Sequence, residues 1–242
     1  GDYLTSYLYM SDEFADFETF DTNLGMDDVK EWMLKHEYLR GALKEGLLHQ
    51  QTLNINPYKF GMIGSTDGHN SLVTPEEDNF FGKFVESEPG PNRIKTKLAG
   101  GRLWENWKIS ASGYAAVWAE ENTRDALFAA MKRKEVYATT GSRIRVRFFG
   151  GWGFNPEMIT QPDYEVLGYQ YGVPMGGDLA VSAGNKSPGF LFSASKDPSG
   201  ANLDRLQIVK GWLDQRGELH EKVYDVVWAG NRIIDDKTGK LE

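Results

Sequence analysis

The hydrophobic periodicity of this sequence changes near residue 142. Before that point, apolar residues recur every four positions, which predicts an amphipathic helix within residues 26–53; the repeating residues are Leu39, Leu43 and Leu47. After it, apolar residues alternate with Arg143, Arg145 and Arg147, which is the period-2 pattern of a half-buried strand. This change predicts an α/β segment followed by a β-rich segment.

The first segment, residues 1–141, is predicted to be an α/β domain. An apolar run at 58–64 predicts a buried strand, and it leads directly into the polar turn GSTDGHN at 64–70. Residues 82–113 are rich in glycine and proline and predict a long loop. A further helix is expected to start at Asn122 or Thr123, followed by a strand at 136–140.

The second segment, residues 142–242, is predicted to be a β-rich domain. Strands are expected at 189–195, 206–213 and 222–228, and the turn residues at 214–217 predict a hairpin between the last two. Such a series of strands favours a small antiparallel β-sandwich.

Composition excludes several kinds of partner and chemistry. The formal net charge is -8, so no general attraction to nucleic acid is expected. No apolar run reaches the roughly 18 residues that a membrane span needs. There are no cysteines, which excludes disulfides, cysteine-zinc sites and a thiol nucleophile.

The turn at 64–70 holds the residues best suited to bind a metal. Asp67 and His69 follow the predicted strand, at the kind of strand end where α/β folds concentrate their sites, and a carboxylate with an imidazole suits zinc, manganese or iron. The alternative is an ordinary tight turn, because Ser, Thr, Asp, Gly and Asn are the residues that turns favour. Two ligands are also fewer than the three or four that a catalytic metal needs.

Other polar groups are weaker candidates. Arg143 adjoins a loop and is a candidate for binding an anionic substrate, whereas an arginine row on a strand is also typical of a charged outer face. The acidic stretch at 11–21 is interpreted as a solvated face rather than as a source of ligands. The remaining histidines are interpreted as structural; these are His36, His49 and His220.

The seven tryptophans suggest a different kind of function, binding rather than catalysis. Exposed aromatic residues on a β-sandwich stack on sugars or peptides, whereas buried ones fill the core. The alternative function is therefore a non-catalytic β-rich binding or structural module, in which the Asp-x-His pattern is only a turn.

Several long segments together resemble a known family, the domain-of-unknown-function family 3604 (DUF3604), which is related to the polymerase-and-histidinol-phosphatase (PHP) superfamily of metal-dependent hydrolases. The resemblance covers nearly all of the chain. It rests on SDEFADFE (11–18), NPYKFGMIGSTDGHN (56–70), EEDNFFGK (76–83), VYATTGSRIRVRFFGGW (136–152), ANLDRLQIVKGWLD (201–214) and GELHEKVYDVVW (217–228).

This resemblance implies an α/β fold, with the C-terminal part of a PHP-like β/α barrel followed by an antiparallel β-sandwich-like region. It also implies that Asp67 and His69 match the Asp-x-His metal ligands of the superfamily, and that the reaction is hydrolysis of a small anionic molecule such as a phosphoester. The superfamily's early His-x-His and middle ligands have no counterpart here. We therefore expect a piece of a longer hydrolase, which binds divalent metal weakly.

Overall fold

The computed structural model describes most of the chain from residue 38 onward. The described residues are 28, 30, 32, 33, 36, 38–72, 74, 79, 81–97, 105, 106, 113–182, 184, 186–235, 237 and 241. The acidic stretch at 11–21 and two of the tryptophans, Trp104 and Trp107, lie outside them.

The chain separates into two compact units. One unit contains the described residues up to Lys59 together with those from Leu203 onward, and the other contains Phe60–Asn202. The strands predicted after residue 142 are thus shared between the two units. The boundary predicted at 141/142 lies within the second unit, and a division into functional domains at that point stays a prediction.

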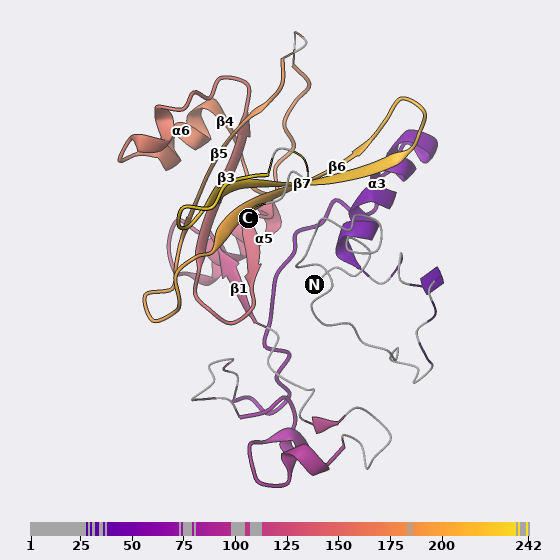
Figure 1. Ribbon diagram of the computed structural model, residues 1–242, viewed down its shortest axis with the longest axis vertical. Helices are drawn as coiled ribbons and strands as arrows, with labels where there is room; N and C mark the ends of the chain where they lie inside the picture. Colours follow the sequence, from indigo (N-terminus) through magenta and orange to yellow (C-terminus); the bar gives the residue numbers. More distant parts are fainter. Residues whose placement is uncertain are drawn as a thin grey trace. The chain divides into compact units, whose positions relative to one another are not determined.

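The first unit is a helix packed on a hairpin. Helix α3 (Leu39–Leu53) ends at Asn54, which adopts the left-handed conformation, as the turn residues at 54–57 predict. Strands β6 (Arg205–Leu213) and β7 (Leu219–Trp228) pair antiparallel, with a register shift at Leu206/Gln207. Figure 1 shows α3 alongside this hairpin.

A buried carboxylate joins the helix to the hairpin. Glu221 of β7 is 4% exposed, and it accepts a 2.6 Å hydrogen bond from Arg40 and lies 3.3 Å from the ammonium of Lys44. Both cations come from α3, so one anion holds two consecutive turns of the helix against the strand.

The second unit contains two small antiparallel sheets. Strands β1 (Tyr114–Val117) and β2 (Val136–Thr139) form the first, and helix α5 (Arg124–Arg133) connects them. The hydroxyl of Thr123 accepts a 3.3 Å hydrogen bond from Ala126 N–H, which confirms the predicted helix cap. The strand predicted at 136–140 is also confirmed.

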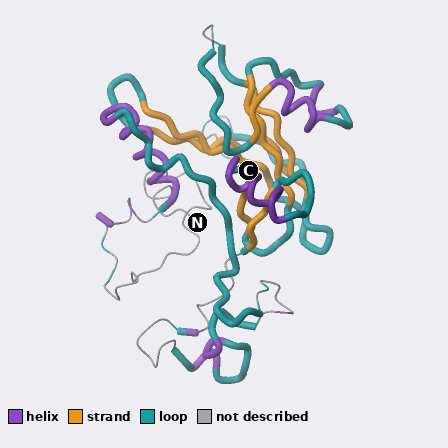
Figure 2. The backbone as a smooth tube through the Cα atoms, turned by 180° about the vertical axis from the view of Figure 1, so that it is seen from behind, coloured by secondary structure: helices purple, strands orange, loops and turns teal. Residues whose placement is uncertain are grey.

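The other sheet of this unit has the strand order β4-β3-β5, and its three strands run side by side in Figure 2. They are β4 (Gly172–Pro174), β3 (Arg145–Gly151) and β5 (Gly189–Ser195). Phe149 on β3 is fully buried and Leu191 on β5 is 4% exposed, so the core of the unit lies on this sheet.

One prediction about local structure is wrong: residues 58–64 form no strand. The region after residue 142, predicted to be β-rich, also contains helix α6 (Tyr164–Tyr171), which packs on β3 and β4, and a short 3₁₀ helix, η5 (Met158–Thr160). The long loop at 82–113 is described in part and contains two further 3₁₀ helices, η2 (Val85–Ser87) and η3 (Arg93–Lys95).

The fold is therefore mixed α/β with small antiparallel sheets. The described residues form no closed barrel, so the barrel part of the expected fold is not confirmed. Within the same residues, no helix has the length and apolar character required to cross a bilayer.

Candidate functional site

The loop that carries Asp67 and His69 starts at the end of the β1–β2 sheet. A Cβ atom added to Gly61 would lie 3.2 Å from the side chain of Lys134, and one added to Gly64 would lie 2.7 Å from the carbonyl oxygen of Tyr114 and 3.1 Å from that of Thr139. Residues 61–64 thus run in the same direction as β2, in close contact with it. Glycine is required at Gly64 because a side chain would collide with main-chain atoms of both strands.

Asp67 adopts an unusual backbone conformation. Its φ angle is 52°, in the left-handed region that aspartate tolerates better than most residues. Its side chain is 47% exposed, and one carboxylate oxygen, Oδ2, contacts the ammonium of Lys83. The other oxygen, Oδ1, lies 3.9 Å from Nδ1 of His69, so the two predicted ligands do lie together.

The ring of His69 is held in one orientation by two contacts. Its Nδ1 lies 2.7 Å from the carbonyl oxygen of Asp67, and its ring centroid lies 4.4 Å from that of Phe84. Because a carbonyl oxygen only accepts hydrogen bonds, Nδ1 must carry the proton. Nε2 lies on the other side of the ring, and no described residue forms a hydrogen bond with it. The side chain is 50% exposed.

A second loop supports the first. The main-chain N–H of His69 donates to the carbonyl oxygen of Lys83 at 2.7 Å, and the amide of Asn70 donates to the carbonyl oxygens of Gly82 and Phe81 at 3.0 and 3.2 Å. Loops 64–70 and 81–87 are therefore tied together at several points. Sequence reasoning did not select Lys83, although it ends one of the segments on which the family resemblance rests.

Arg143, the predicted anion-binding residue, contacts the first residue of β1 and the loop at 197–199. Its guanidinium lies 5.8 Å over the ring of Tyr114, and its main-chain N–H donates to a carboxylate oxygen of Asp197 at 2.6 Å. This hydrogen bond and a second one from Ser199 N–H lower the pKa of Asp197. The structure brings Asp67 and His69 together with Lys83, and the role of Arg143 stays a prediction.

The arginine row on β3 is not a uniform outer face. Arg145 is exposed, but Arg147 lies 3.6 Å over the ring of Trp118 and donates to the hydroxyl of Tyr169 at 3.1 Å. That hydroxyl donates to Glu135 at 2.6 Å. Burial, followed by the hydrogen bond to Glu135, raises the pKa of Tyr169. The interpretation of a solvated arginine row is therefore wrong for Arg147.

Three potential ligands also meet in the β6–β7 hairpin. The ligand atoms of Asp214, Glu218 and His220 all lie within 4.8 Å of one another. However, Asp214 Oδ1 accepts the main-chain N–H groups of Arg216 and Glu218 at 2.8 and 2.9 Å, and Oδ2 lies 2.9 Å from Nε2 of His220. These hydrogen bonds belong to the turn, and the interpretation of His220 as structural stays a prediction.

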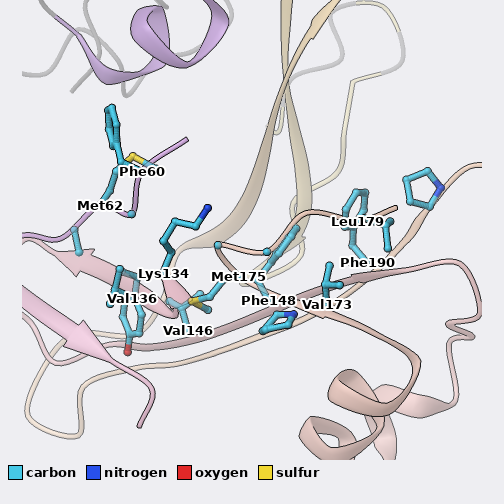
Figure 3. A pocket seen from close by; sticks show the side chains of 18 of the residues that line it. Phe60, Met62, Lys134, Val136, Val146, Phe148, Val173, Met175, Leu179 and Phe190 are labelled. Carbon is cyan, nitrogen blue, oxygen red and sulfur yellow. The ribbon is translucent and has the colours of Figure 1, made fainter. Parts of the chain in front are cut away.

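The second unit also contains an apolar cavity of about 730 Å³, shown in Figure 3. Phe60 and Met62 lie on one side, and Leu179 and Phe190 on the other, with Phe148 between them. Asp67, His69 and Arg143 are not part of this lining. The cavity is therefore separate from the Asp67–His69 loop.

Comparisons with known proteins identify the family. No curated protein and no solved structure matches the chain. One family model does, over residues 2–242, and its description is "Protein of unknown function (DUF3604)". Because the match spans almost the whole chain, this protein belongs to the DUF3604 family.

Proposed function

We propose that this chain is part of a metal-dependent hydrolase in which Asp67 and His69 bind a divalent metal ion. The observation that carries the proposal is the hydrogen bond from His69 Nδ1 to the carbonyl oxygen of Asp67. Metal-binding histidines commonly donate their second ring nitrogen in this way, which fixes the tautomer and directs the other lone pair outward.

The donor atoms suit a divalent ion in kind. An imidazole nitrogen and a carboxylate oxygen are ligands that zinc, manganese and iron share. The site has two such donors where three or four are usual, so the proposal requires further ligands, from water or from other residues. Weak binding by the isolated chain is expected, because water would replace each missing donor.

The fold gives the proposal limited support. The segment at 61–64 runs along β2 and leads into the ligand loop near the end of that strand, although it does not pair with β2 as a strand. Kinship with the PHP barrel is part of the proposal, and it rests on the resemblance of the motifs.

The proposed reaction is hydrolysis of a small anionic ester such as a phosphoester. When bound, a divalent ion supplies Lewis-acid activation of water and neutralises charge that develops on the substrate. Asp67 contributes a negative charge, and His69 contributes a neutral nitrogen donor whose orientation Phe84 maintains. Arg143 is the predicted partner for the anionic group of the substrate.

The test is titration of the protein with Mn²⁺, measured by calorimetry, in parallel with the variants Asp67→Asn and His69→Gln. Both substitutions preserve size and are expected to weaken Mn²⁺ binding by at least tenfold. His49→Gln is the matched control, since His49 lies on α3 in the other unit, near the ring of Tyr58. Equal affinity and stoichiometry in all four proteins would overturn the proposal.

That result would favour the alternative, a non-catalytic binding module. Two observations support it: Lys83 already neutralises Asp67, as in a structural turn, and the apolar cavity has the size of a small-molecule site. The hydrogen bond of His69 to the main chain is compatible with both proposals, so the Mn²⁺ titration decides between them.

A further inference from the structure

The apolar cavity of the second unit has one charged side chain among the described residues that line it, Lys134. We propose that this cavity binds a small molecule with an apolar body and a single carboxylate, and that the carboxylate pairs with the ammonium of Lys134. The inference does not depend on a metal at Asp67 and His69, because neither residue lines the cavity. It assigns a ligand class to a site that the proposed function does not use.

The cavity has the size and the surface of a small-molecule site. Its volume of about 730 Å³ lies within the range of roughly 300–1,000 Å³ that such sites span. The rings of Phe148 and Phe190 stack with their centroids 5.3 Å apart, and both belong to the lining. Phe60 and Phe190 are 46% and 47% exposed. Aromatic surface that stays open to solvent in one concave place is typical of a binding site rather than of a core.

Strand β3 supplies a rigid part of this lining. It pairs with β4 on one side and β5 on the other, and its alternating residues Val146, Phe148 and Gly150 all line the cavity. Gly150 leaves part of the space open. A Cβ added there would make ordinary van der Waals contacts, 3.5 Å from the ring of Phe190 and 4.0 Å from Leu179. A larger side chain at this position would therefore occupy the volume that a ligand needs.

The polar groups of the lining favour an apolar ligand over a sugar. The hydroxyl of Tyr137 donates to the carbonyl oxygen of Ile144 at 3.0 Å, and the indole N–H of Trp152 donates to that of Ala180 at 2.9 Å. Both side chains therefore already use their donors within the protein. A ligand with many hydroxyl groups would lose its hydrogen bonds to water without replacing them, whereas an apolar body loses none.

The structure fixes Lys134 in the cavity wall. Lys134 follows the last residue of α5 with a φ angle of 65°, a left-handed conformation in which glycine is usual, and its main-chain N–H donates to the carbonyl oxygens of Ala130 and Met131. The stem of its side chain lies between two glycines. A Cβ added to Gly61 would lie 3.2 Å from the Cβ and Cγ of Lys134, and one added to Gly176 would lie 2.6 Å from its Cβ.

The helix dipole alone does not account for a cation at this position. Lys132 and Arg133 already provide positive charge in the last turn of α5. Figure 3 shows Lys134 between Met62 and Phe148, two apolar members of the lining. Apolar neighbours lower the local dielectric constant, which strengthens the attraction between the ammonium and an anion. The charge of Lys134 thus complements a carboxylate at one end of an apolar ligand.

The experiment is titration of the full chain, measured by calorimetry, with two apolar carboxylates of different shape, octanoate and 2-naphthoate. Their uncharged counterparts are 1-octanol and 2-naphthamide. Lys134→Met is expected to weaken binding of the carboxylates about tenfold and to leave the uncharged ligands nearly unaffected. Lys134→Arg should retain carboxylate binding. Lys132→Met is the matched control, because Lys132 is exposed on α5 and does not line the cavity.

A second variant tests the location of the ligand. Gly150→Val fills part of the cavity and is expected to weaken all four ligands about tenfold. Gly153→Val is its control, since a Cβ added to Gly153 meets no atom within 4 Å and this residue lies outside the lining. Circular dichroism verifies that each variant is folded. Val146→Phe, on the same strand, replaces Gly150→Val if that variant does not fold.

Three results would overturn the proposal. The first is that neither carboxylate binds the unmodified protein saturably, which is also the result expected if a protein segment occupies the cavity. The second is unchanged carboxylate affinity in a folded cavity-filling variant, which would place the ligand elsewhere. The third is an equal loss of charged and uncharged ligands in Lys134→Met, since a lysine that served only the structure would not distinguish the two.

Discussion

At the scale of single residues, Arg147 makes contacts that should contribute measurably to stability. Its guanidinium stacks on Trp118 and donates to Tyr169. A cation–π contact and a hydrogen bond from a charged donor are together worth about 2 kcal/mol. Arg147→Met should therefore lower the free energy of unfolding by about 2 kcal/mol in urea titrations.

Arg145→Met is the internal control for that prediction. Arg145 is two residues away on the same strand and is exposed, so its loss should change stability by less than about 0.5 kcal/mol. Equal effects of the two substitutions would mean that the stacking on Trp118 contributes nothing. The alternation of apolar residues and arginines correctly predicted a strand here, but period 2 alone does not reveal which arginines meet an aromatic partner.

In the candidate site, too, the sequence predicts the contact between residues close in the chain but not the contact with a residue far along it. The spacing of Asp67 and His69 is enough to predict that they share a turn, because residues two apart in a turn stay close. The proximity of Lys83 depends on a hydrogen bond across 14 residues, from His69 N–H to its carbonyl oxygen. No spacing rule predicts such a contact between two loops, so sequence reasoning could not find this residue.

At the scale of elements, the β6–β7 hairpin depends on an ionised Asp214. The hydrogen bond to His220, followed by those from main-chain N–H groups in the turn, lowers the pKa of Asp214. A carboxyl group with a lowered pKa adds stability that is fully present above its unfolded value, about 3.9, and is lost as the pH falls through the folded pKa. The hairpin should therefore weaken in acid.

Urea unfolding of the chain and of Asp214→Asn, followed from pH 6 to pH 2, tests this. The asparagine retains the acceptor oxygen for the turn but does not ionise in this range. The difference in stability between the two proteins should be constant above about pH 4 and should shrink below it. A difference that does not depend on pH would show that the charge of Asp214 is irrelevant to the hairpin.

Two elements show the limits of local patterns. Residues 164–171 form a helix, α6, that no pattern predicted, and Gly168 allows it to lie close to Phe149; a Cβ there would lie 2.6 Å from the ring. Residues 58–64 have the apolar character of a strand, but Gly61 and Gly64 press against β1 and β2 without regular pairing. Tertiary contacts decided both cases.

At the scale of the whole molecule, one unit is assembled from two separate stretches of the chain and the other from a single stretch. The first unit joins α3 to β6 and β7, which follow it by some 150 residues, whereas the second is one continuous stretch, Phe60–Asn202. Helical and strand periodicities predicted most of these elements separately. They carry no information about which distant elements share a core, so the pairing of α3 with the hairpin could not be predicted.

Because each unit is compact by itself, we expect a substitution that destabilises one unit to leave the stability of the other nearly unchanged. Glu221→Gln removes the anion that two cations of α3 share, at a cost of about 3 kcal/mol in its own unit. Amide hydrogen exchange should then become about a hundredfold faster in 39–53 and 205–228, with little change in 145–151 and 189–195. Arg147→Met should produce the opposite pattern. If either substitution accelerated exchange equally in all four segments, the whole chain would unfold as one cooperative unit. The two units would then not unfold independently.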